Sequence, residues 1–203
     1  DAGTAASGAN NDGSINVSAG NQWKNTTAGF SITKSTGTGS NATVGHGLGA
    51  KPDLIILKRT NSTENWNTYH SAIGATKLIA LNSTGAASDT NDFQDTEPTN
   101  TVFSIGTGTG NNGNGDTYMA YAWTAIPGYS AFGKYIGNGS SNGPFVYTGF
   151  RPKWLMIKKS SSGAEHWRIV DTERDDHNLA DKEIYANSNV AENSSSLCDI
   201  LSN

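Results

Sequence analysis

The stretch Gly49–Lys58, with the sequence GAKPDLIILK, has a close match at Gly149–Lys158, with the sequence GFRPKWLMIK. In both stretches a glycine and a proline precede a run of four apolar residues. Proline fits the first position of a strand because its missing N–H removes no bond from the ladder there. An apolar run without alternation predicts a strand that is buried on both faces. The sequence therefore predicts a central strand at Leu54–Leu57, and Pro52 and Pro152 mark equivalent strand entrances.

Three shorter matches keep the same order along the chain, which indicates an internal repeat of about 100 residues. The distance between matching residues drifts from 99 to 105, as loop insertions between fixed strands would produce. The matching segments are Gly29-Phe30-Ser31 with Gly128-Tyr129-Ser130, Glu64-Asn65-Trp66 with Glu165-His166-Trp167, and Asn82-Ser83 with Asn187-Ser188.

The composition favours strands and turns over helices. The 203 residues include 24 Gly and 22 each of Ser, Thr and Asn, which are weak helix formers, and only 16% of the residues are charged. Five Trp, seven Tyr and six Phe lie within short apolar runs, which is not typical of a disordered chain. We therefore predict an all-β protein built from tandem antiparallel β-sandwich repeats of a jelly-roll-like kind.

The repeat also predicts how the chain is divided. Residues 1–27 are rich in Gly, Ser and Asn, so we expect a connecting segment there, with one weak strand at Ser14–Ser18. The first sandwich is expected over residues 28–126 and the second over residues 127–203. Strands are predicted in the first at Phe30–Lys34, Ala42–His46, Asp53–Arg59, Asn65–His70, Lys77–Leu81, Thr101–Ile105 and Thr117–Thr124. Strands are predicted in the second at Tyr129–Ile136, Pro144–Thr148, Lys153–Lys159, His166–Asp171 and Glu183–Ala186.

The second copy is expected to be incomplete. It stops where the counterparts of Thr101–Ile105 and Thr117–Thr124 would follow, so we expect either an excerpt of a longer chain or a neighbouring subunit that completes the sheet. The strand Thr117–Thr124 alternates large and small side chains. Its small side chains, Ala120 and Ala122, share a face with Tyr118 and predict that another layer approaches closely on that side.

Charge and composition exclude several classes of function. The formal net charge is −4 and the basic residues are scattered, so no nucleic-acid partner is expected. The apolar runs are too short for a transmembrane helix, so no insertion into a membrane is expected. Cys198 is the single cysteine, so no intrachain disulfide can form. The chain starts at Asp1 without Met, which indicates a mature, cleaved or excerpted protein.

No catalytic residue, cofactor or metal site is predicted, and we do not expect an enzyme. The chain contains no G-x-S-x-G elbow, and it has no H-x-x-x-H or C-x-x-C spacing for zinc. Loop carboxylates could pair for glycoside cleavage, but solvated charges are the favoured interpretation. These carboxylates belong to Glu64, Asp89, Asp92, Asp95 and Glu97. The acidic loop at residues 171–178 lacks the glycine and the final glutamate of an EF-hand and contains Arg174, so a surface turn is favoured over a calcium site.

Trp66 and Trp167 are the candidate ligand-binding residues, together with His166. The two tryptophans occupy matching places in the repeat, and an aromatic face packs well on the apolar face of a pyranose ring. A core tryptophan at the same place in each copy explains the match as well, and it is the favoured interpretation.

Two segments of the chain resemble a known family. They are Ala28–Ser31 followed by Asn41–Gly49, and Gly128–Gly139 followed by Gly143–Pro152. The chain from about residue 28 onward is similar to an uncharacterised domain family of large structural and tail-fibre-like proteins of marine bacteriophages. The resemblance implies a β-rich, extracellular virion protein, either a tail fibre or a capsid decoration. No catalytic residues are assigned in that family, so the resemblance supplies none.

The expected function is attachment of the virion to a host-surface glycan. Partners would be other virion proteins and further copies of the chain. A trimer is expected, because the resemblance to phage fibres implies one and because a neighbouring copy could supply the missing strands. Many weak sites would then gain strength through multivalency. Two alternatives stay open at this point. One is a tailspike-type hydrolase that degrades polysaccharide, and the other is a structural spacer without a ligand.

Overall fold

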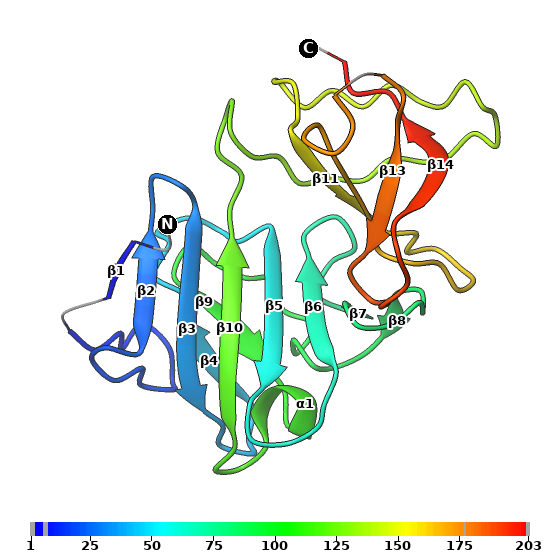
Figure 1. Cartoon of the computed structure of the whole chain (residues 1–203). Coiled ribbons are helices and arrows are strands. Elements are labelled where there is room, and N and C mark those ends of the chain that lie inside the picture. The colour runs from blue at the N-terminus through cyan, green and yellow to red at the C-terminus, as the bar shows by residue number, and fades with distance from the viewer. Residues whose placement is uncertain (1–2, 6–7, 177, 202–203) are drawn as a thin grey trace.

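The fold is mostly β, with antiparallel sheets and almost no helix (Figure 1). The computed structural model describes residues 3–5, 8–176 and 178–201. The elements up to residue 123 are β1 (Thr4–Ala5), β2 (Gln22–Asn25), β3 (Phe30–Thr36), β4 (Ala42–Gly45), β5 (Leu54–Arg59), β6 (Trp66–His70), β7 (Lys77–Ala80), β8 (Ser88–Asp89), β9 (Val102–Ile105), α1 (Thr109–Asn112) and β10 (Thr117–Trp123). They are followed by β11 (Trp154–Ile157), β12 (Arg168–Asp171), β13 (Ala180–Tyr185) and β14 (Asn193–Cys198). No helix in the described part of the chain has the length and apolarity that a membrane crossing requires.

An eight-stranded sheet dominates the structure, in the order β1-β2-β3-β10-β5-β6-β7-β8. The two-stranded sheet of β4 and β9 lies behind it in the view of Figure 1. The main core fills the space between these two layers, with Ile55 of β5 and Phe103 of β9 both almost fully buried. Ala120 and Ala122 of β10 belong to this core, so the predicted close approach of a second layer is confirmed.

The amino-terminal residues belong to this two-layer structure and are not the separate connecting segment that the composition predicts. β1 and β2 extend the large sheet beyond β3. Ile15 and Val17 are buried in the main core, although they form isolated bridges and not the predicted strand at Ser14–Ser18. The buried Gln22 side chain ties this stretch down, since its Nε2 donates to Thr33 Oγ1 and to the Gly45 carbonyl, both at 2.9 Å. Gly, Ser and Asn therefore mark turns here, without marking a linker.

β11 to β14 form a separate four-stranded sheet, in that order. It lies beside the β7–β8 end of the large sheet (Figure 1). Hydrogen bonds join the two parts of the chain. Lys158 Nζ and the Glu165 N–H both donate to the Thr84 carbonyl at 2.9 Å, and the Ala87 N–H donates to the Ser160 carbonyl at 3.1 Å. A second, smaller core packs Val170, Ala180 and Ile200 together.

β5 and β11, which carry the matching apolar runs, pair with β6 and β12 in the same register, although β5 is central in its sheet and β11 lies at the edge. β5 and β6 place Ile55 opposite Tyr69, while β11 and β12 place Leu155 opposite Val170. The shared glycine of the motif is also explained, because Gly49 and Gly149 have φ angles of +74° and +82°, which glycine adopts without strain. The remaining register pairs agree between the two sheets: Leu54–His70 with Trp154–Asp171, Thr68–Ile79 with Ile169–Ile184, and Lys77–Asp89 with Lys182–Ser194.

Two predicted strands of the second copy are not formed. Tyr129–Ile136 and Pro144–Thr148 have no strand assignment, and most of their residues are exposed. In the first copy the matching strands are β3, which pairs with β10, and β4, which pairs with β9. No described strand offers the second copy those pairings. An apolar segment without a hydrogen-bonding neighbour gains nothing from the extended ladder, so the two segments remain coil.

The environment of His46 leads us to expect that the stability of the fold depends on pH. The ring is buried, with Nδ1 accepting from the Leu48 N–H at 3.2 Å and Nε2 lying 3.3 Å from the Thr99 carbonyl, so the neutral ring satisfies both contacts. Burial lowers the pKa of His46 from its ordinary value of 6.5, against the opposing effect of the bond to Thr99. As the pH falls below 6.5, His46 takes up a proton in the unfolded chain before it does so in the folded chain. Each further pH unit of acidification should therefore lower the free energy of unfolding by up to about 1.4 kcal/mol.

Urea unfolding at several pH values between neutrality and mild acid measures this slope. The variant His46→Gln keeps a polar side chain that does not titrate, and it should show a shallower slope than the parent. A residual slope is expected from His70, since burial lowers the pKa of that ring as well. An unchanged slope in His46→Gln would contradict the buried neutral ring.

Candidate ligand-binding face

The outer face of the large sheet, opposite the β4–β9 layer, carries a row of four stacked aromatic side chains. We call Phe30, Trp123, Tyr121 and Trp66 the aromatic row. The ring centroids of Phe30 and Trp123 are 4.8 Å apart, and those of Tyr121 are 6.4 Å from both Trp123 and Trp66. All four side chains are half-buried, so each keeps part of its ring accessible to solvent.

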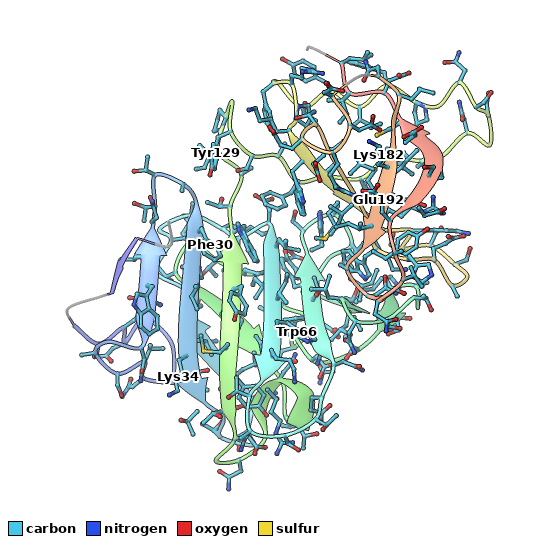
Figure 2. All side chains as sticks on the ribbon, viewed as in Figure 1. Phe30, Lys34, Trp66, Tyr129, Lys182 and Glu192 are labelled. Carbon is cyan, nitrogen blue, oxygen red and sulfur yellow. The ribbon has the colours of Figure 1, made fainter. Side chains whose placement is uncertain are left out.

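Strand alternation and register place these residues on one face. Phe30 lies opposite Trp123 in the β3–β10 pairing, and Tyr121 follows on the same face of β10 because residues two apart point the same way. Trp66 lies at the start of β6, where it pairs with Lys58 of β5. The buried side chains of Leu54 and Ile56 lie between these strands on the same face. Figure 2 shows Phe30, Trp66 and Lys34 on the side of the sheet that is turned to the viewer.

A hollow of about 240 Å³ adjoins the Trp66 end of the row. It is lined by Trp66, Leu81 and Asn82 from the β6–β7 region and by Ala186 from the end of β13. Asn82 Oδ1 accepts the Trp66 N–H at 2.9 Å, and its Nδ2 donates to Asn65 Oδ1 at 3.0 Å. The hollow therefore combines an apolar floor with an amide whose position is set by two hydrogen bonds.

The structure gives the two candidate tryptophans different environments. Trp66 belongs to the aromatic row, whereas Trp167 is only 5% exposed and donates its indole N–H to the Ala80 carbonyl at 3.0 Å. Trp167 thus connects β12 to the large sheet, as a core tryptophan would. Its backbone N–H donates to Asn187 Oδ1 at 2.8 Å, which is the counterpart of the bond from Trp66 to Asn82.

His166 lies apart from the aromatic row. Its ring stacks on Tyr185 with centroids 4.3 Å apart and planes at 13°. Asn187 Nδ2 donates to its Nδ1 at 3.0 Å. These contacts orient the ring within the second sheet. The three predicted ligand-binding residues therefore have different environments: Trp66 stacks in the aromatic row, Trp167 is buried, and His166 stacks on Tyr185.

The loop carboxylates mostly hold the fold together. Glu97 binds Tyr69 and Lys51, Glu64 Oε1 accepts from Thr109 at 3.0 Å, and Asp89 pairs with Lys77 at 2.6 Å. Asp92 Oδ2 accepts from the Thr90 hydroxyl at 2.5 Å. Among the described residues, no three His, Cys, Asp or Glu side chains are placed to share a metal ion.

The acidic loop at residues 171–178 uses its carboxylates on its own backbone. Asp171 binds the Arg174 side chain at 2.8 Å and the backbone N–H groups of Glu173 and Arg174, and these bonds lower its pKa. Asp175 Oδ2 accepts the Asp181 N–H at 2.5 Å. This geometry is that of a surface turn. His177, which also belongs to this loop, lies outside the described residues.

Three members of the aromatic row were not among the candidates from the sequence. Tyr121 and Trp123 share a face of the alternating strand, so the pattern could have identified them as an aromatic edge. Phe30 could not be added from sequence, because its contact with Trp123 depends on a pairing between strands that are distant in the chain.

Comparison with known proteins gives a family but no function. No curated protein and no solved structure matches the chain. A family model described as "Domain of unknown function (DUF7483)" matches residues 2–203, nearly the whole sequence. The chain therefore belongs to the DUF7483 domain family.

Proposed function

We propose that the chain is a non-enzymatic adhesion module of a virion, a tail fibre or capsid decoration, that binds host-surface glycan through the aromatic row. The carrying observation is the row itself, four half-buried rings stacked across β3, β10 and β6. Aromatic faces pack against the apolar faces of pyranose rings. A line of partly exposed aromatic rings on a rigid sheet suits an extended polysaccharide better than a single small molecule.

The surroundings of the row support a sugar ligand. The hollow beside Trp66 provides space for one ring, and Asn82, which lines it, has an amide that can bond hydroxyl groups. Lys34 of β3 is exposed on the same face and adds a hydrogen-bond donor there (Figure 2). Each such site would be weak, so useful attachment depends on several copies, for which we propose a homotrimer on the virion surface, outside the cell.

We also propose that the two sheets are copies of one β-sandwich design in tandem. The shared register of β5–β8 and β11–β14 supports this, as do the matching bonds from Asn82 and Asn187. In this proposal the second copy lacks the covering layer that β4 and β9 give the first.

A glycan array that includes bacterial surface polysaccharides tests the adhesion proposal. The parent protein should bind at least one polysaccharide, and the variants Trp66→Ala and Tyr121→Ala should each bind about tenfold more weakly, because losing a stacking ring costs more than 1 kcal/mol. Trp154→Ala is the matched control, since Trp154 is exposed but lies on β11, away from the row. Near-UV circular dichroism of each variant verifies that the sheet is intact.

Three results would count against the proposal. Absence of binding by the assembled protein would favour a spacer without a ligand. Equal loss of binding in Trp154→Ala and Trp66→Ala would show that the row is not the site. Release of shorter saccharides from a bound polysaccharide would favour the hydrolase.

A further inference from the structure

We infer that the open edge of β11 is an acceptor site for an added β-strand that resembles β10, supplied by polypeptide other than the described strands. The added strand would alternate small and aromatic residues, as Thr117–Trp123 does, and would follow an acidic residue, as β10 follows Asp116. This inference does not depend on the glycan site.

The first argument is the template within the chain. β5 has two neighbours, β6 on one side and β10 on the other. β11 pairs with β12 in the register of β5 and β6, but it stands at the edge of its sheet. The position that β10 occupies beside β5 is therefore open beside β11 within the described part of the chain (Figure 1).

The backbone of β11 is oriented for such a partner. The Thr172 N–H donates to the Lys153 carbonyl at 3.0 Å, so residue 153 and every second residue after it bond to β12. The backbone groups of Trp154 and Met156 point to the opposite side. No described residue forms a backbone hydrogen bond with them there. Unpaired edges of this kind are the sites at which an extended peptide adds a strand.

Burial gives a second argument. Leu54, Ile55, Ile56 and Leu57 of β5 are all buried, whereas none of the four residues of β11 is, and Trp154 is 55% exposed. β11 therefore has the apolar composition of a central strand, although it lies at the edge of its sheet. A neighbouring strand would remove this apolar surface from water, which favours its addition.

The unformed strands give a third argument. Tyr135 and Ile136 lie in the counterpart of β3, Phe145 and Tyr147 lie in the counterpart of β4, and all four are exposed. In the first copy β10 pairs with β3 on one side and β5 on the other. A strand added beside β11 would offer the Tyr129–Ile136 segment the partner that it lacks.

Charge supports the choice of occupant. Asp116 precedes β10, and its carboxylate lies 2.6 Å from Arg59 Nη2 at the end of β5. The counterpart of Arg59 is Lys159, so the matching position on the added strand would also suit an acid. A second folded copy is a poor donor, because its own β10 is bonded on both sides and would have to leave its sheet.

The experiment adds a synthetic peptide with the sequence of Asp116–Thr124, DTYMAYAWT, to the whole chain. Amide hydrogen exchange at Met156, on the open side, should slow about tenfold or more. Exchange at Leu155, which is already bonded to β12, should change much less. A control peptide carries N-methyl groups at the positions of Met119 and Tyr121, whose backbone groups face β5 in the template, and it should give no protection.

Each other outcome decides against the inference. No slowing at Met156 with millimolar peptide would overturn it. Equal protection by the N-methylated peptide would show contact through side chains and not strand addition. Protection of Met156 that rises with protein concentration in the absence of peptide would identify a second copy as the occupant, which would overturn the choice made above.

Discussion

Replacing Ile55 by alanine is expected to lower the free energy of unfolding by about 3 kcal/mol, and replacing its counterpart Leu155 by only about 1 kcal/mol. Both residues occupy the second position of their strands, β5 and β11, and they pair with matching partners, Tyr69 and Val170. Ile55 is fully buried between the two layers of the first part, so its removal leaves a cavity. Leu155 is only partly buried beside the small core of the second sheet, so less apolar surface is lost.

Urea unfolding followed by circular dichroism measures both values. Ile136→Ala serves as the surface control and should change the stability little, because Ile136 is 89% exposed. Equal losses for Ile55→Ala and Leu155→Ala would mean that β11 is covered in solution as fully as β5. In that case the description of β11 as an open edge strand would be wrong for the free chain.

The strands β5 and β11 and the turns before them could be predicted from the sequence because their causes are local, although β11 lies at the edge of its sheet. An apolar run of four residues, a proline at the strand entrance and a glycine with positive φ specify β5 and β11 within ten residues each. The pairing of β5 with β6 follows, because the two strands are close in the chain. Even the alternation of β10 correctly identified Ala120 and Ala122 as the face toward a second layer.

The failures involve contacts between distant segments. Whether Tyr129–Ile136 becomes a strand depends on a partner, and the same apolar pattern that forms β3 in the first copy remains coil in the second. For residues 1–27 the prediction underestimated the structure. Their polar composition predicts a connecting segment, yet Ile15 and Val17 contribute to the core. Composition describes a segment, but it does not describe what lies beside it.

In the candidate site, too, local features could be predicted from the sequence and contacts between distant segments could not. Trp66 was chosen for a reason that applies equally to Trp167, namely its place in the repeat, yet only Trp66 joins the aromatic row. The difference arises because Trp167 bonds to Ala80 of β7, a contact between the two sheets that the local sequence does not predict. Matching sequence positions therefore differ in solvent exposure according to what the neighbouring sheet covers.

Glu97 anchors the long connection between β7 and β9 to the buried end of β6. Its Oε2 accepts from the Tyr69 hydroxyl at 2.6 Å and from Lys51 Nζ at 2.9 Å, and its Oε1 accepts the Ala75 N–H at 2.8 Å. Desolvation alone would raise the pKa of Glu97, but the hydrogen bonds from Tyr69 and Lys51 outweigh it and lower the pKa. Tyr69 is fully buried, so its hydroxyl depends on the carboxylate as its partner in the intact chain.

Glu97→Ala is therefore expected to lower the free energy of unfolding by about 2 kcal/mol, most of it from the stranded Tyr69 hydroxyl. The ion pair with Lys51 contributes little, because both side chains are 46% exposed. In the Tyr69→Phe background no hydroxyl is left unpaired, so the same substitution should cost about 1 kcal/mol, and this difference measures the coupling.

Because the pKa of Glu97 is lowered in the folded state, its ionised form stabilises the fold above the ordinary value of 4.5, and this stabilisation is lost as the pH falls through the folded-state pKa. The cost of Glu97→Gln should accordingly shrink in acid, and a cost that stays constant across that range would contradict an ionised anchor.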